Sequence, residues 1–394
     1  MISAKWNKFK LGDIAQIVGG GTPSTSKPEY WGGDIPWVTP RDLSFSDERF
    51  VSHGERSITE EGLKNSSTKV LPKGAVLLTT RAPIGYLRIA QNPICTNQGF
   101  KSLIPDEEVV NSHFLYYLLR NNVEYLKSVG VGSTFAEISG SALSRLEFMF
   151  PPLETQEKIV EILSALDEKI ELNRQTNATL EAIAQAVFKE WFIDFNFPGA
   201  TGEMVSSPLG PIPKGWKVGV LGDIMNITMG QSPPGRSYNE IGHGPPFFQG
   251  KADFGFRFPR KRVFTTDPKR FAKKHETLLS VRAPVGEINM SSMDCCIGRG
   301  LASIIDKKKL KSFTFYYLSF LKPSIQSYGD SGTVFSSISK RELENVPCIL
   351  PPREIALLFE QTCSVIDERI ELKEDESQLL AKLRDVSLLN ILQK

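Results

Sequence analysis

The sequence predicts an α+β protein with two copies of a mixed α/β domain, each followed by a long α-helix. Three observations predict this fold class. Short blocks recur in the same order about 200 residues apart, each copy ends in a Pro-Pro step, and apolar residues at alternating spacings of three and four follow each step. The two helices are expected to separate the domains and to pair as an antiparallel coiled coil, giving a pseudo-two-fold internal repeat.

The repeat extends over most of the chain. LGDI begins at Leu11 and again at Leu221, an offset of 210, whereas DEKIEL at Asp167 and DERIEL at Asp367 are 200 residues apart. Between them lie RAPIG at Arg81 and RAPVG at Arg282, YYL at Tyr116 and Tyr316, and GSTFAEIS at Gly132 and GTVFSSIS at Gly332. Because the order of the blocks is kept while the offset shrinks, the chain is interpreted as a tandem duplication.

Each copy shows the same order of elements. Alternating β-rich stretches such as AVLLTTRAPIGYLRIA come first, bounded by Gly and Pro turns. A short helix is expected near His113–Lys127 in the first copy and near Ser312–Leu321 in the second. A last strand, LEFMF or VPCIL, then leads into the Pro-Pro step. Proline is tolerated in the first turn of a helix, so a long helix is expected to begin there.

The long helices carry a seam of residues at coiled-coil spacing. In the first helix the seam is Leu163, Leu166, Ile170, Asn173, Asn177, Leu180, Ala184, Val187 and Trp191. In the second it is Phe359, Cys363, Ile366, Ile370, Lys373, Ser377 and Leu380. Both seams turn polar at matching positions, which would fix register and orientation. Alternatively, each helix packs only on its own domain.

These elements give a division of the chain by residue number. Mixed α/β domains are expected at 1–152 and 215–352, spacer helices at 153–196 and 353–394, and a linker at 197–214. A helix over 153–194 would be about 60 Å long. A DNA turn is about 34–36 Å, so such a rod could hold two DNA-reading domains about one turn apart.

Positive charge is concentrated in the second domain. Residues 212–350 hold 21 basic and 11 acidic residues, a net charge of +10, and residues 1–152 hold 16 and 15, a net charge of +1. Residues 153–211 hold 4 basic and 10 acidic residues, a net charge of −6. Residues 351–394 hold 6 basic and 9 acidic residues, a net charge of −3, so both helical segments are acidic. This pattern indicates globular parts that meet a polyanion and helices that meet protein.

The sequence lacks the motifs of several enzyme classes. It has no GxxxxGK[ST] phosphate loop, no nucleotide or S-adenosylmethionine glycine motif, and no defensible Ser/His/Asp arrangement. The five cysteines form no CxxC pair and are expected to be buried, reduced thiols, so no zinc site is indicated. Together, the missing motifs predict a non-catalytic protein. With no secretory signal and no membrane-length apolar run, a cytoplasmic protein is expected.

Candidate DNA-binding residues are basic, amide or hydroxyl side chains and aromatics in the expected loops. In the first domain they are Thr22, Ser24, Lys27, Tyr30, Trp31, Thr39, Arg41, Thr80, Arg81, Asn97, Gln98, Ser133 and Thr134. In the second they are Gln231, Ser232, Arg236, Tyr238, Gln249, Lys251, Arg257, Arg260, Lys261, Arg262, Arg282, Arg299 and Thr333. Both copies share Arg81 and Arg282, so this pair is expected to contact phosphate or to make a structural hydrogen bond.

The chain resembles type I restriction–modification specificity subunits. The resemblance rests on the helix starts PPLETQEKIVEIL and PPREIALLFE and on the blocks LGDI…GGGTPS, WGGDIPWVTPRDL, RAPIG and GSTF. It implies that each target-recognition domain reads one half of a bipartite site in double-stranded DNA, and that the helices set the spacer. It also implies docking of two methyltransferase subunits, with translocating endonuclease subunits joining them. S-adenosylmethionine, ATP and Mg²⁺ would belong to those partners and not to this chain.

The second domain departs from the family pattern, because HGPPFFQGKADF stands in place of the WGGDIPW block. Two other readings stay open. The chain could serve a single fused nuclease–methyltransferase polypeptide, or it could be a stand-alone DNA-binding regulator. Acidic coiled-coil helices of this length favour subunit docking over the regulator.

Overall fold

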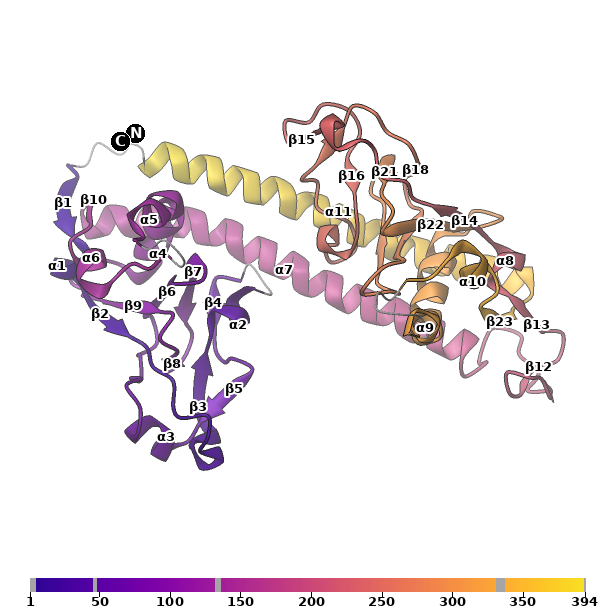
Figure 1. The fold of residues 1–394 in the computed structure, drawn as a ribbon, viewed down its shortest axis with the longest axis horizontal. Helices are drawn as coiled ribbons and strands as arrows, with labels where there is room; N and C mark the ends of the chain where they lie inside the picture. The colour runs from indigo at the N-terminus through magenta and orange to yellow at the C-terminus, as the bar shows by residue number, and fades with distance from the viewer. Residues whose placement is uncertain (1–4, 45–47, 132–135, 331–336, 393–394) are drawn as a thin grey trace. The chain divides into compact units, whose positions relative to one another are not determined.

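The computed structural model describes residues 5–44, 48–131, 136–330 and 337–392. It divides into two compact units. The first comprises Met1–Leu172 with Ser377–Lys394, and the second comprises Asn173–Glu376. Each unit therefore contains one α/β domain together with a part of both long helices. Figure 1 labels most of the elements of both units.

The α/β domain of the first unit is built mainly on a five-stranded sheet in the order β2-β9-β6-β7-β4. A three-stranded sheet, β5-β3-β8, and the strand pair β1-β10 complete it. Its strands are β1 (Asn7–Lys10), β2 (Ala15–Gly19), β3 (Trp31–Val38), β4 (Phe50–Val51), β5 (Arg56–Ile58), β6 (Val76–Thr80), β7 (Ile84–Ala90), β8 (Cys95–Thr96), β9 (Lys101–Pro105) and β10 (Glu147–Phe150). Its helices are α1 (Leu11–Ile14), η1 (Pro28–Tyr30), α2 (Pro40–Ser44), α3 (Glu60–Lys64), α4 (Ser112–Asn121), α5 (Val123–Val129) and α6 (Gly140–Ser144).

The second unit has a four-stranded sheet in the order β14-β22-β19-β20 and a three-stranded sheet, β16-β21-β18. The pairs β13-β23, β15-β17 and β11-β12 complete it. Its strands are β11 (Met204–Val205), β12 (Ile212–Pro213), β13 (Lys217–Val220), β14 (Met225–Met229), β15 (Tyr238–Asn239), β16 (Phe247–Phe248), β17 (Phe264–Thr265), β18 (Phe271–Ala272), β19 (Thr277–Ser280), β20 (Ile288–Met290), β21 (Cys295–Ile297), β22 (Leu301–Asp306) and β23 (Pro347–Leu350). Its helices are α8 (Leu221–Ile224), η2 (Gly235–Ser237), η3 (Lys251–Asp253), α9 (Lys311–Asp330) and α10 (Lys340–Glu344).

The two domains repeat the same backbone hydrogen bonds, so the predicted duplication is confirmed. The repeated LGDI forms α1 and α8, and the amide of Leu11 donates to Leu146 O as that of Leu221 donates to Val346 O, both at 2.9 Å. The repeated serines Ser139 and Ser339 are the N-caps of α6 and α10. A hydroxyl at this position accepts from a backbone amide of the first helical turn, which explains why both copies keep it.

The long helices begin directly after the Pro-Pro steps, as predicted. They are α7 (Leu153–Phe192) and α11 (Arg353–Leu392), each of 40 residues. The carbonyl of Pro152 accepts from Gln156 N at 3.0 Å, and that of Pro352 accepts from Ala356 N at 3.2 Å. At 1.5 Å per residue each helix is about 60 Å long.

α7 and α11 pair in antiparallel orientation, as expected, and Figure 1 shows them side by side. In the second unit, Asn173 Nδ2 donates to Glu376 Oε2 at 2.9 Å and Asn177 Nδ2 to Ile370 O at 3.3 Å. Further along α7, the ring of Phe188 lies 5.5 Å from that of Phe359. As the residue number rises on α7, that of its partner on α11 falls. The alternative of two helices that pack only on their own domains is therefore wrong.

The predicted seam residues lie on the helix faces that are packed against other parts of the protein. Leu163, Asn173, Asn177, Ala184, Phe359, Cys363 and Ile370 are buried, whereas Leu166, Ile170, Leu180, Val187, Trp191, Ile366, Lys373, Ser377 and Leu380 are partly buried. Four further helix residues outside the predicted seam are also buried: Phe188, Phe192, Arg384 and Leu388. Phe188 and Phe192 stack at 4.8 Å and belong to the apolar core of the second unit.

Two short helices differ from the prediction. The helix expected over His113–Lys127 is divided into α4 and α5 at Asn122, whose side chain donates to Leu118 O at 2.8 Å. The helix expected over Ser312–Leu321 continues to Asp330, although it contains Pro323. Among the described residues, no helix is both long enough and apolar enough to cross a membrane. All five cysteines are free and buried, as predicted.

Candidate nucleic-acid interface

Three loops meet at one edge of the first domain. They are the loop after β2, the turn between β8 and β9, and the segment after β3. Gly21 N donates to Thr96 O at 2.9 Å, Asn97 N donates to Val38 O at 3.0 Å, and the Thr22 hydroxyl bonds the Gln98 side chain. A Cβ on Gly20 would lie 2.0 Å from Asn97 O, so only glycine permits this close approach.

The second domain builds the same junction from its own loops. Gln231 N donates to Ile297 O at 2.9 Å, Gly298 N donates to Phe248 O at 2.8 Å, and Arg299 N donates to Ser232 Oγ at 3.2 Å. A Cβ on Gly230 would lie 2.1 Å from Gly298 O. The two domains thus hold their loops with equivalent hydrogen bonds, so each loop position in one domain has a counterpart in the other. In this correspondence Gln98 of the first domain matches Arg299 of the second.

Most first-domain candidates are accessible. Thr22, Ser24, Lys27, Arg41, Arg81 and Gln98 are exposed, and Tyr30, Trp31, Thr39 and Asn97 are partly buried. Trp31 is held in place, because its Nε1 donates to Ser24 O at 3.2 Å and the Arg56 guanidinium lies 3.4 Å from its ring centroid. Ser133 and Thr134 lie outside the described residues.

Thr80 is a wrong candidate. Its side chain is fully buried, and its backbone joins two neighbouring segments. Thr80 N donates to Gly99 O at 2.8 Å, and its carbonyl accepts from Ile138 N at 3.0 Å. The following residue, Arg81, is exposed and lies 3.9 Å from Glu137. Arg282 occupies the matching place in the second domain, because the residue before it makes the same two hydrogen bonds as Thr80. Val281 N donates to Gly300 O at 2.9 Å, and the Val281 carbonyl accepts from Ile338 N.

Most second-domain candidates are also accessible. Gln231, Arg236, Gln249, Lys251, Arg260, Lys261, Arg262, Arg282 and Arg299 are exposed, and Ser232 and Tyr238 are partly buried. Thr333 lies outside the described residues. Within the described ranges, the guanidinium groups of Arg236, Arg260, Arg282 and Arg299 and the ammonium group of Lys261 form no ion pair. They are therefore the strongest candidates for contact with an external anion.

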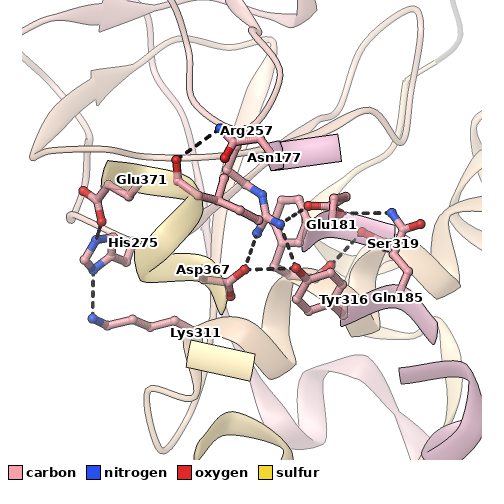
Figure 2. A network of polar contacts seen from close by, with 12 residues as sticks. Asn177, Glu181, Gln185, Arg257, His275, Lys311, Tyr316, Ser319, Asp367 and Glu371 are labelled. Atoms are coloured by element: carbon pink, nitrogen blue, oxygen red, sulfur yellow. Dashed lines mark hydrogen bonds and ion pairs between the residues drawn. The ribbon is translucent and has the colours of Figure 1, made fainter. Parts of the chain in front are cut away.

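Arg257 is a wrong candidate, because it is used inside the protein (Figure 2). Its side chain is 1% exposed and contacts the carboxylates of Asp367, at 3.0 Å, and Glu181. It also donates to the Tyr316 hydroxyl at 2.7 Å. Burial opposes the charged form of Arg257, but the carboxylates, Asp367 above all, raise its pKa above the ordinary value.

Other basic side chains of the 251–275 stretch also have internal partners. Arg262 donates to Asp253 at 2.6 Å, Lys273 pairs with Asp294 at 2.7 Å, and Lys274 pairs with Glu371 at 2.9 Å. The stretch is therefore only partly available to an anion. The number of basic residues in the sequence overestimates the surface that this stretch offers to an anion, because the sequence does not show which of them pair with carboxylates of the protein.

His275 belongs to a second polar network, which Figure 2 also draws. Lys311 Nζ lies 2.8 Å from His275 Nδ1, and His275 Nε2 lies 2.9 Å from Glu371 Oε2. With the lysine donating to Nδ1, the Nε2 proton is donated to Glu371. The hydrogen bond from His275, together with that from Lys274, outweighs burial and lowers the pKa of Glu371 to about 2.

The first domain has its own anchor on the long helices. The Tyr117 hydroxyl donates to Asp167 Oδ2 at 2.6 Å, and Arg384 donates to Asp167 Oδ1 at 2.6 Å. Arg49 Nη1 donates to the Tyr117 hydroxyl at 3.0 Å. Sequence reasoning missed these anchoring residues. The shared acids Asp167 and Asp367, in the repeated DEKIEL and DERIEL, were the available signal.

In the described part of the chain, no group of three or more His, Cys, Asp and Glu side chains is placed so that it could hold a metal ion. The described geometry offers exposed hydroxyl, amide and guanidinium groups on braced loops. Such groups suit recognition of base edges and phosphates.

Comparisons with known proteins agree with this arrangement. The family model of the type I restriction modification DNA specificity domain matches residues 3–182 and 213–381. The type I restriction enzyme MjaIX specificity subunit of Methanocaldococcus jannaschii is 36% identical, over 98% of this chain and 92% of that protein. The HindI specificity subunit of Haemophilus influenzae is 25% identical over 98% of both.

A solved structure shows the same fold. The type I restriction–modification S subunit from M. genitalium aligns with a TM-score of 0.59 at 16% identity, over 98% of this chain and 96% of that one. The duplicated domains, the paired helices and the family match together show that this chain belongs to the specificity subunits of type I restriction–modification enzymes.

Proposed function

We propose that each domain reads one half of a bipartite, asymmetric site in double-stranded DNA. The observation that carries the proposal is the pair Gln98 and Arg299. Both are exposed at equivalent points of the same hydrogen-bonded junction, yet their side chains differ. An amide and a guanidinium favour different bases, adenine for the first and guanine for the second. One framework with different side chains suits two different half-sites.

Phosphate contacts would position the domains on the duplex. Arg81 and Arg282 are exposed and shared by both copies, which suits a contact that carries no sequence information. Arg236, Arg260 and Lys261 supply further positive charge in the second domain. The net charge of +10 over residues 212–350 supports this role.

The long helices would set the length of the non-specific spacer and dock two methyltransferase subunits. α11 carries an outer apolar stripe with a spacing of seven residues. The stripe consists of Leu358, Val365, Leu372, Leu379 and Val386, which are 37%, 66%, 64%, 68% and 55% exposed. A seven-residue spacing keeps side chains along one helix face. Exposed apolar side chains in such a row support contact with another protein.

Chemistry would reside in the partners of this chain. S-adenosylmethionine would belong to the methyltransferase subunits, and ATP and Mg²⁺ would belong to the nuclease machinery, including the endonuclease subunits that join the complex. This chain would contribute the choice of site. The assembly would act on DNA in the cytoplasm.

Co-expression with the methyltransferase tests the proposal. Methylated positions would be mapped by sequencing DNA from cells that contain the methyltransferase with or without this chain. The expected result is a split motif of two short, different half-sites with a fixed run of unspecified bases between them. A continuous motif, or the same methylation without this chain, would rule the proposal out.

A further inference from the structure

The segment after β16 corresponds to the segment after β3, although their sequences do not match. β3 pairs in parallel with β8 through Trp37–Cys95 and Val38–Thr96. β16 pairs in parallel with β21 through Phe247–Cys296 and Phe248–Ile297. Cys95 and Cys296 are 201 residues apart, the same offset as Arg81 and Arg282. The residue that follows each strand is therefore equivalent, which pairs Thr39 with Gln249.

A carboxylate braces both positions in the same way. Asp42 Oδ2 accepts from Thr39 N at 2.7 Å, and Asp253 Oδ2 accepts from Gln249 N at 2.7 Å. Asp253 is itself held by Arg262, which donates to Oδ1 at 2.6 Å. Arg262, a DNA-binding candidate from the sequence, is thus also a positioning residue for this turn.

Glycine contacts on the opposite side hold the turn as well. A Cβ on Gly300 would lie 2.3 Å from Gln249 O. In the first domain, a Cβ on Gly99 would lie 3.0 Å from the ring of Pro40. The turn after each strand therefore packs closely on the neighbouring turn, and its backbone is fixed before any ligand arrives.

The two braced residues present different chemistry. The Thr39 hydroxyl donates its proton to Asp42 Oδ2 at 2.7 Å, so it can act towards a ligand only as an acceptor. Gln249 is exposed, and within the described ranges no hydrogen bond engages its side-chain amide. Gln249, Lys251 and Arg262 line an open groove of about 670 Å³ with Asp253 and Pro284. An amide with a free donor and a free acceptor thus lines this groove beside two basic side chains, Lys251, which lies 3.6 Å from Glu287, and Arg262, which pairs with Asp253.

We propose that Gln249 is a specificity-determining residue, which reads an adenine in the half-site of the second domain. Its amide oxygen would accept from adenine N6 and its amide nitrogen would donate to N7, a pairing that no other base offers in the major groove. Lys251 would contact the adjacent phosphate. The inference rests on the proposed function and adds to it one residue and the base that it reads. Thr39 has no amide and its hydroxyl proton is held by Asp42, so it cannot form this pair of hydrogen bonds with adenine at the equivalent position.

The test uses the full chain co-purified with its methyltransferase partner and a pool of duplexes that is randomised at both half-sites. The unsubstituted chain is expected to prefer one adenine in the second half-site by about 10- to 100-fold. Gln249→Ala should abolish that preference and leave the first half-site unchanged. Gln249→Glu should shift the preference to cytosine, whose N4 amino group donates to a carboxylate.

Lys251→Ala is the matched control. It should weaken binding to all sequences alike and reduce the slope of log affinity against log salt by about 1. Preserved preferences at the other positions of the second half-site in Gln249→Ala show that the second domain of the variant is folded. An unaltered second half-site in Gln249→Ala, or equal losses at every position of both half-sites, would overturn the inference. If the unsubstituted chain selects no split site, the proposed function itself fails.

Discussion

The charged groups of Arg257 and Asp367 lie 3.0 Å apart, although the residues are 110 positions apart in the chain. Asp367 belongs to α11, Arg257 belongs to the α/β domain, and the arginine also contacts Glu181 of α7. The second domain is thereby tied to both long helices. Buried ionised groups such as these stabilise the fold only while each charge keeps its oppositely charged partner.

Removal of Arg257 should strongly destabilise the chain. In Arg257→Ala, Glu181 and Asp367 would remain in a poorly solvated position without their counter-charge, which costs about 3 to 5 kcal/mol. Urea denaturation would measure the change. Arg260→Ala is the control, because this arginine is exposed and its loss should change the unfolding free energy by no more than about 0.5 kcal/mol. Equal stability of the two variants would contradict the anchor.

The contribution of Glu371 should depend on pH. Because its folded pKa, about 2, lies below the ordinary value of 4.5, its contribution is fully present above pH 4.5. It should decline as the pH falls from 4.5 towards 2, when the carboxylate is protonated and its bonds with His275 and Lys274 weaken. The measurement is the difference in unfolding free energy between the unsubstituted chain and Glu371→Gln at several pH values. A difference that does not shrink between pH 5 and pH 3 would refute this assignment.

Gln98 and Arg299 should each affect only one half of the site. Arg299→Ala should relax discrimination at a guanine in the second half-site by about 1 to 3 kcal/mol, because a bidentate guanidinium contact is lost. Gln98→Ala should relax one position in the first half-site. Competition binding with duplexes substituted one base pair at a time measures both effects. The account fails if either variant alters both half-sites.

The outer stripe of α11 should be needed for assembly and not for folding. Leu379 is 68% exposed, so Leu379→Glu should leave the thermal unfolding midpoint nearly unchanged. It should reduce the amount of methyltransferase that co-purifies, because a charge would be buried in the interface. Gln378→Glu, at an exposed neighbouring position, is the control for added charge. Full recovery of methyltransferase with Leu379→Glu would show that this face is not the docking surface.

The fold was largely predictable because its signals are local and repeated. The Pro-Pro steps indicated where α7 and α11 begin, and matched blocks indicated the duplication. The division between α4 and α5 was missed, because it depends on how Asn122 bonds the preceding turn. The continuation of α9 past Leu321 was missed, because proline normally ends a helix and here does not.

The candidate interface was less predictable for a physical reason. Arg257 and Arg260 lie in the same basic stretch, and nothing in the sequence distinguishes them. Only the structure shows that Arg257 contacts carboxylates of the two long helices. The equivalence of Thr39 and Gln249 was also hidden. The offset between the copies is still 210 here, as at LGDI, but HGPPFFQGKADF shares no block with WGGDIPWVTPRDL. Only the parallel pairing of β3 with β8 and of β16 with β21 shows which residues correspond.

Each domain is proposed to read its own half-site. The most direct test replaces residues 1–150 with those of another family member and maps the methylated motif of the resulting complex by sequencing. The account predicts that one half-site changes while the other half-site and the spacer length stay the same. A motif altered in both halves, or in neither, would contradict it.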